Sequence, residues 1–152
     1  MIEQALRYEI EQAIPELTGE LYPTHAPETY VKPYLVYTRT KTDITKVLDG
    51  YESNHALSFM WSIMTAKYAD MASIRDKLEQ LLIQMPKHII GDVAKSYKVD
   101  GLNMQVKDIK ALVRQLSPNS VYVEDIAIDD INETYEYNLG VNRGIIIFTI
   151  YI

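Results

Sequence analysis

Residues 144–152 constrain the fold most, because they form an almost unbroken run of β-branched and aromatic side chains, Gly-Ile-Ile-Ile-Phe-Thr-Ile-Tyr-Ile. Such a run predicts a β-strand, since these side chains pack well on a pleated surface. The strand is too apolar to leave one side in water, so it needs partners on both faces or along both edges. At an exposed sheet edge it would favour aggregation, whereas in an assembly it could pair with another subunit.

Two further segments alternate apolar and polar residues with the period of a strand. Residues 34–40 form the first and residues 55–66 the second, in which one face carries Leu57, Phe59, Trp61 and Ile63. The residues between them, 41–54, are polar and contain the turn signal Asp49-Gly50, so we expect a long link. Because binding residues concentrate on loops, this link is either a flexible connection or an arm that reaches a neighbouring molecule.

Helices are expected wherever apolar residues recur at helical spacing, which they do over 2–14, 70–85 and 103–116. Asp70 and Asn103 are the expected N-caps of the second and third helices. Residues 88–99, between these two helices, are ambiguous and could contain short strands. The chain therefore places its helices between groups of strands.

Two other stretches are less regular. Residues 18–33 are interrupted by prolines and predict a loop, with Leu21-Tyr22 as a short extended piece inside it. Residues 121–131 alternate, but the phase shifts between Val123 and Ile126, which predicts a bulge or bend in a strand.

This order of elements favours an α+β fold with a mostly antiparallel sheet packed against helices. The 152 residues suit a single domain, 1–152, and contain neither an internal repeat nor a linker. Hydrophobic residues make up 47% and charged residues 24%, which excludes wholesale disorder. No apolar run approaches the roughly 18 residues of a transmembrane helix, so no membrane partner is expected.

The chain offers little for catalysis. It has no cysteine, which excludes thiolate chemistry, and its three histidines are not arranged at metal-ligand spacing. It also lacks a glycine-rich phosphate loop and a nucleophile elbow. We therefore expect no enzyme, no catalytic residue, no cofactor and no metal site. The net charge of −6 argues against tight binding to a phosphate backbone.

Two features leave alternatives open. The acidic pairs Glu124-Asp125 and Asp129-Asp130 could be a solvated strand edge, the carboxylates of a small hydrolase, or an acidic surface that DNA passes without sticking. Tyrosine is abundant, with 12 residues against 2 Phe and 1 Trp. Tyrosine is favoured at surfaces that become interfaces, and it is also a good strand residue.

The order of these segments resembles the tail-terminator, or tail-to-head joining, proteins of long-tailed bacteriophages. The resemblance covers most of the chain. An N-terminal helix is followed by Tyr22-Pro23-Thr24-His25-Ala26-Pro27 and then by Pro33-Tyr34-Leu35-Val36-Tyr37-Thr38-Arg39. A polar link, the alternating strand and a helix come next, from Leu57 to Leu82. A hairpin closes the pattern, from Tyr135 to Tyr151 with Gly140, Arg143 and Phe148. The helical pattern within 88–120 departs from the shortest members of the family.

The resemblance implies a non-enzymatic virion protein, located in the tail at the head–tail junction and assembled in the host cytoplasm. It implies a ring, expected to be a hexamer, that caps the tail tube, stops its polymerisation and joins the tail to the head connector. The implied partners are further copies of this chain, the tail tube protein, a head-completion or stopper protein, and DNA that passes without specific binding. Another tail part, such as a tube or stopper subunit, is the alternative, followed by the small hydrolase.

Two segments are the best candidates for contacts in such an assembly, because each is long or rich in tyrosine and is flanked by firm strands. They are the link 41–54 and the turn 135–144. The contact residues expected from them are Lys41, Thr42, Asp43, Lys46, Tyr51, Tyr135, Tyr137, Asn142 and Arg143. Asp129 and Asp130 are expected to face a channel for DNA.

Overall fold

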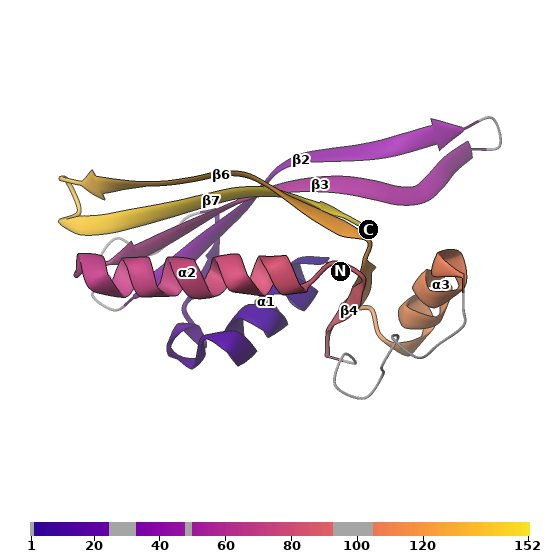
Figure 1. The fold of residues 1–152 in the computed structure, drawn as a ribbon, viewed down its shortest axis with the longest axis horizontal. Coiled ribbons are helices and arrows are strands. Elements are labelled where there is room, and N and C mark those ends of the chain that lie inside the picture. Colours follow the sequence, from indigo (N-terminus) through magenta and orange to yellow (C-terminus); the bar gives the residue numbers. More distant parts are fainter. Residues whose placement is uncertain (1, 25–32, 48–49, 93–104) are drawn as a thin grey trace.

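The computed structural model describes residues 2–24, 33–47, 50–92 and 105–152 (Figure 1). In chain order, the elements are α1 (Ile2–Ala13), the 3-10 turn η1 (Pro15–Leu17), β1 (Leu21–Pro23), β2 (Tyr34–Val47), β3 (Gly50–Thr65), α2 (Tyr68–Gln84), β4 (His88–Gly91), α3 (Val106–Leu116), β5 (Ser120–Val123), β6 (Asp125–Glu136) and β7 (Val141–Tyr151). They form one α+β domain, as the sequence predicted.

The main sheet has the strand order β1-β2-β3-β7-β6. All neighbouring strands are antiparallel except β1, which runs parallel to β2. The apolar strand β7 lies between β3 and β6, so its backbone is paired along both edges. Its need for two neighbours is therefore met within the chain, and the idea that it pairs with another subunit is wrong.

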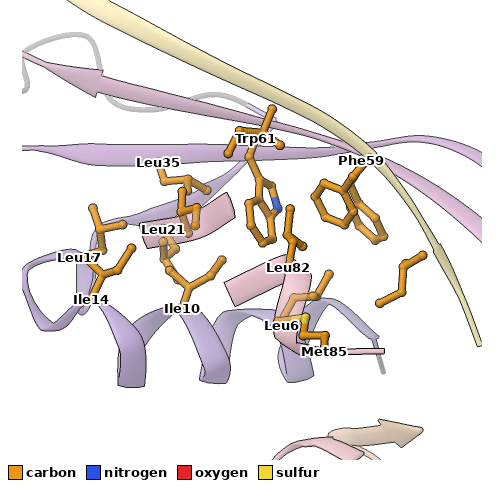
Figure 2. Packing of buried hydrophobic residues seen from close by; sticks show 14 of the residues in the cluster. Leu6, Ile10, Ile14, Leu17, Leu21, Leu35, Phe59, Trp61, Leu82 and Met85 are labelled. Atoms are coloured by element: carbon orange, nitrogen blue, oxygen red, sulfur yellow. The ribbon is translucent and has the colours of Figure 1, made fainter. Parts of the chain in front are cut away.

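One face of the main sheet is covered by α1 and α2 (Figure 1). Trp61 is 1% exposed and meets the Phe148 ring edge to face at 4.6 Å. Leu6 and Ile10 of α1, and Leu82 of α2, lie in the same buried cluster (Figure 2). Because these apolar residues recur at helical spacing, each helix presents one continuous apolar stripe to the sheet.

The other face is the open face, over which no helix lies in the part of the chain that the structure describes (Figure 1). It carries apolar residues that are only half-buried and, between them, hydroxyl groups. From the strand register, its residues include Val36, Thr38, Ser58, Met60, Ser62, Met64, Ile145, Ile147 and Thr149.

A second, smaller sheet of β4 and β5 lies beside α3 at one end of the molecule (Figure 1). It has its own small core of Ile89, Ile109, Val113 and Tyr122. The phase shift predicted within 121–131 marks the point, at Glu124, where the chain leaves this sheet and enters the main one. A second irregularity, which the sequence did not predict, lies farther along, between Ile128 and Asp130.

The prediction of a polar link over 41–54 is wrong, because β2 continues to Val47 and β3 begins at Gly50. The two strands remain paired, with Ile44 opposite His55 and Lys46 opposite Tyr51. The β3–β7 ladder begins at Ala56, opposite Tyr151, so the β3 residues before Ala56 lie outside this ladder. Residues 44–47 and 50–55 thus form a two-stranded extension, here called the arm. A two-stranded ribbon that lies beyond the core needs no alternating apolar face, so the sequence of this segment resembled that of a loop.

Two predicted helix starts are also wrong. The helix α2 begins at Tyr68 with Lys67 at the N-cap position, so Asp70 lies in its first turn. The helix α3 begins at Val106 with Gln105 in an extended N-cap conformation. Asn103 lies outside the described residues, as do residues 93–99 of the segment 88–99, in which short strands were expected as a possibility; the described part of that segment contains β4.

Candidate interaction surfaces

The predicted contact residues of the 41–54 segment lie where the arm leaves the sheet. Lys41, Thr42 and Asp43 are exposed, and the Lys41 ammonium lies 3.2 Å from the Asp43 carboxylate. The backbones of Lys46 and Tyr51 pair with each other in the arm, and their side chains lie outside the described part.

The turn between β6 and β7 presents an exposed apolar group, here called the aromatic tip and made of Tyr135, Tyr137 and Leu139. Tyr137 is 87% exposed and Leu139 is 56% exposed. The Tyr135 and Tyr137 rings meet edge to face at 5.0 Å. The reversal needs a left-handed residue, which Gly140 supplies with φ +65°. Large side chains held in water by a firm hairpin are typical of an interaction surface.

Asn142 and Arg143 make contacts within the chain. The Asn142 amide donates to the Ala66 carbonyl at 3.3 Å. The Arg143 guanidinium donates to the Ser62 hydroxyl at 2.9 Å and to the Glu136 carboxylate at 3.2 Å. It therefore lies along the open face, over a serine that is 2% exposed. These residues support the hairpin that carries the aromatic tip.

Asp129 and Asp130 both lie on the open face. Consecutive strand residues normally point to opposite faces, but the irregularity between Ile128 and Asp130 inserts Asp129 as an extra residue. The Thr149 hydroxyl donates to Asp129 at 2.9 Å, and the Asn132 amide donates to Asp130 at 2.8 Å. The bulge thus places two exposed carboxylates side by side, as the prediction of a shared acidic surface requires.

An exposed polar cluster near the aromatic tip was not predicted from the sequence. The Arg75 guanidinium lies 2.6 Å from the Glu133 carboxylate, which also accepts from the Tyr68 hydroxyl at 3.0 Å. These hydrogen bonds lower the pKa of Glu133 and raise that of Tyr68. The residues come from α2 and β6, so no local spacing could have revealed the cluster.

A pocket of about 150 Å³ lies at the end of the main sheet that is opposite to the aromatic tip. It is lined by His55 at the base of the arm and by residues of α3, β5 and the C-terminal strand, namely Lys110, Val113, Arg114, Ser120, Val121, Tyr122 and Ile152. Lys110 is buried and pairs with Glu124 at 3.1 Å. The backbones of His55 and Ile152 hydrogen-bond each other at 2.9 Å in both directions, which fixes the rim.

The strand register separates the two predicted contact segments. The aromatic tip lies near the end of the sheet where Asn142 pairs with Thr65, whereas the arm extends past the end where Tyr151 pairs with Ala56. Figure 1 shows the two hairpins pointing in opposite directions. They therefore form two surfaces at opposite ends of one molecule.

The described residues contain no group of three or more His, Asp or Glu side chains placed to hold a metal ion. The His88 ring contacts the Pro86 carbonyl at 2.9 Å, His55 lines the pocket, and His25 lies outside the described part. The acidic residue Glu124 is paired with Lys110. No helix among the described residues is long and apolar enough to cross a membrane.

No protein-family model matches the sequence, and no curated protein matches it. Among solved structures, the fold is similar to a chain described as "Virion of native gene transfer agent (GTA) particle". The identity is 10% and the TM-score 0.49, and the match covers 99% of this chain and 96% of that chain.

Proposed function

We propose that this protein is a non-enzymatic tail-assembly protein of a long-tailed phage, forming a ring at the head–tail junction. The ring, a hexamer by the family resemblance, caps the tail tube, stops its polymerisation and joins the tail to the head connector. The observation that carries the proposal is the placement of two projecting hairpins at opposite ends of one sheet (Figure 1). Such a subunit can contact one neighbour through the arm and a different neighbour through the aromatic tip.

The arm supports this proposal because isolated two-stranded ribbons are at best marginally stable in water. In the strand ladders, residues 44–47 and 50–55 of the arm pair only with each other within the described part of the chain, whereas the backbone of His55 at its base also bonds Ile152. A neighbouring subunit, the tail tube protein or a head-completion protein would supply the missing contacts.

The charge distribution supports contacts between unlike surfaces. The edge strand β6 carries five carboxylates and no basic residue. Two β6 edges placed against each other would bring like charges together, which destabilises a two-fold contact. Heterologous contacts repeat around a ring when the rotation closes. The same strand places Asp129 and Asp130 on the open face, where in a ring they would repel DNA that passes through.

Native mass spectrometry and negative-stain imaging over a range of protein and Mg²⁺ concentrations test the ring. Closed rings of about six subunits are expected. Open-ended tubes would instead favour a tube subunit. A protein that stays monomeric and does not bind isolated tail tubes would contradict the proposal.

The role of the arm is tested by replacing residues 45–54 with Asn-Gly. Ile44 and His55 are register partners, so they can flank a two-residue turn that closes the shortened hairpin. The shortened protein should fold with an unchanged unfolding transition but fail to join tails to heads in a complementation assay. Asp49→Asn, which keeps the arm at full length, is the matched control. Infectious particles from the shortened variant would exclude the arm from the contact surface.

A further inference from the structure

We infer that the pocket beside α3 receives the Tyr137 side chain of a second copy of this chain, so that the aromatic tip of one subunit docks at the base of the next subunit's arm. This inference rests on the proposed ring and names the contact that would build it.

The size of the pocket fits one aromatic ring. Its volume is about 150 Å³, and an apolar protein cavity of about 150 Å³ holds one benzene molecule. Val113, Val121 and Ile152 supply apolar walls, while His55 and Arg114 place polar groups at the same site. A tyrosine suits this mixture because its ring is apolar and its hydroxyl requires a hydrogen-bond partner when buried.

Tyr137 is the best candidate for the occupant within the described part of the chain. It is 87% exposed, more than the other exposed large hydrophobic residues, and Tyr135 braces its ring. Leu139, on the same turn, is 56% exposed and would cover the rim. Tyrosines that enter a pocket at the centre of an interface commonly dominate its binding energy.

The two sides carry net charges of opposite sign. The strand β6, which leads into the aromatic tip, carries five carboxylates, of which Glu133 and Glu136 are paired with Arg75 and Arg143. The helix α3, which forms one wall of the pocket, carries Lys107, Lys110 and Arg114 against Asp108, and Lys110 is paired with Glu124. After these pairs are counted, the strand remains net negative and the helix net positive, which favours this partner over a second acidic surface.

The geometry makes the contact directional. The hairpin that carries the tip and the helix α3 lie at opposite ends of the molecule (Figure 1), and α3 forms one wall of the pocket. A bound pair therefore leaves one tip and one pocket unused. Each added copy repeats the same heterologous contact, and the assembly either closes as a ring or grows as a filament.

The absence of cysteine from the chain permits a clean test by cross-linking. Leu139→Cys, which keeps Tyr137, and Arg114→Cys proteins are prepared separately and treated with a short bismaleimide, alone and mixed. Cross-linked dimers are expected only in the mixture. Leu139→Cys mixed with Gln84→Cys, on the exposed side of α2, is the matched control and should give none. Dimers of Leu139→Cys alone would indicate a two-fold contact and overturn the inference.

A second measurement separates this inference from the proposed ring. Tyr137→Ala should weaken self-association in sedimentation velocity by at least about tenfold, as expected for the loss of a buried interface tyrosine. Tyr137→Phe, which keeps the ring, should retain most of the affinity. Rings that form without mixed cross-links and are unaffected by Tyr137→Ala would overturn the inference and leave the proposed function standing. Open filaments with mixed cross-links would support the inference and contradict the proposed ring. An absence of self-association and of cross-links would overturn the inference, and together with a failure to bind isolated tail tubes it would also contradict the proposed function.

Discussion

The two faces of the main sheet carry similar side chains in different surroundings. On the covered face, Ile146 and Phe148 are 0% exposed beneath the helices. On the open face, their neighbours Ile145 and Ile147 are half-buried and lie among hydroxyl groups and carboxylates. Apolar residues on one strand therefore serve the core on one side and remain available for contacts on the other. Substitutions on the two faces should separate stability from assembly.

The largest effect on stability is expected at Trp61. Trp61→Ala removes a fully buried ring that meets Phe148 edge to face and should lower the free energy of unfolding by about 3–5 kcal/mol. Met60→Ala, one residue away on the open face, should cost less than half as much because its site can relax into solvent. Urea denaturation of both variants measures the difference, and equal losses would contradict the contrast between the faces.

A smaller loss is expected at Gly144, where α2 approaches the covered face closely. A Cβ at this position would lie 2.7 Å from the Met71 sulfur, so Gly144→Ala must displace a buried side chain. Overpacking of this kind costs about 1–3 kcal/mol. Thermal unfolding should show the loss, with Met71→Ala introduced as a second substitution to test for partial rescue. A Gly144→Ala protein of unchanged stability would show that the contact between Gly144 and Met71 leaves room for a methyl group.

On the open face, reversing the charges of Asp129 and Asp130 should have little effect on folding. Both side chains are exposed, so Asp129→Lys with Asp130→Lys should change the free energy of unfolding by less than about 1 kcal/mol. Under the proposed function, ring formation should persist while DNA ejection is impaired. Asn132→Lys, on the same face, controls for the added positive charge. Normal DNA ejection by the doubly reversed variant would exclude these residues from a channel wall.

The smallest effect is a dependence on pH at the edge of the covered face. Hydrogen bonds from Arg75 and Tyr68 lower the pKa of Glu133 in the folded state below its ordinary value of 4.5. Its stabilising contribution is therefore present above pH 4.5 and is lost as the pH falls through the lowered pKa. Unfolding of wild type and Glu133→Gln should differ most near neutral pH and converge in acid. A difference that grows in acid would contradict this sign.

Local patterns predicted the elements whose side chains alternate or repeat against a core. The stripes of α1 and α2 and the strand around Trp61 were found in this way, whereas the exposed turn was predicted from its tyrosine content. For residues 41–54 the patterns predicted a link or an arm and missed its paired strands, because a ribbon beyond the core requires no alternation. The pocket and the Arg75–Glu133 pair were missed because their residues lie far apart in the chain.

The residues alone predict a strand over 144–152 that needs neighbours on both sides, and a chain that combines helices with antiparallel strands. Three features follow only from the folded chain: the neighbours of that strand are β3 and β6, the helices cover one particular face of the sheet, and a bulge turns Asp129 and Asp130 to the same side. Propensity and periodicity act between residues near in sequence. Pairing partners, covered faces and pockets depend instead on contacts between distant segments.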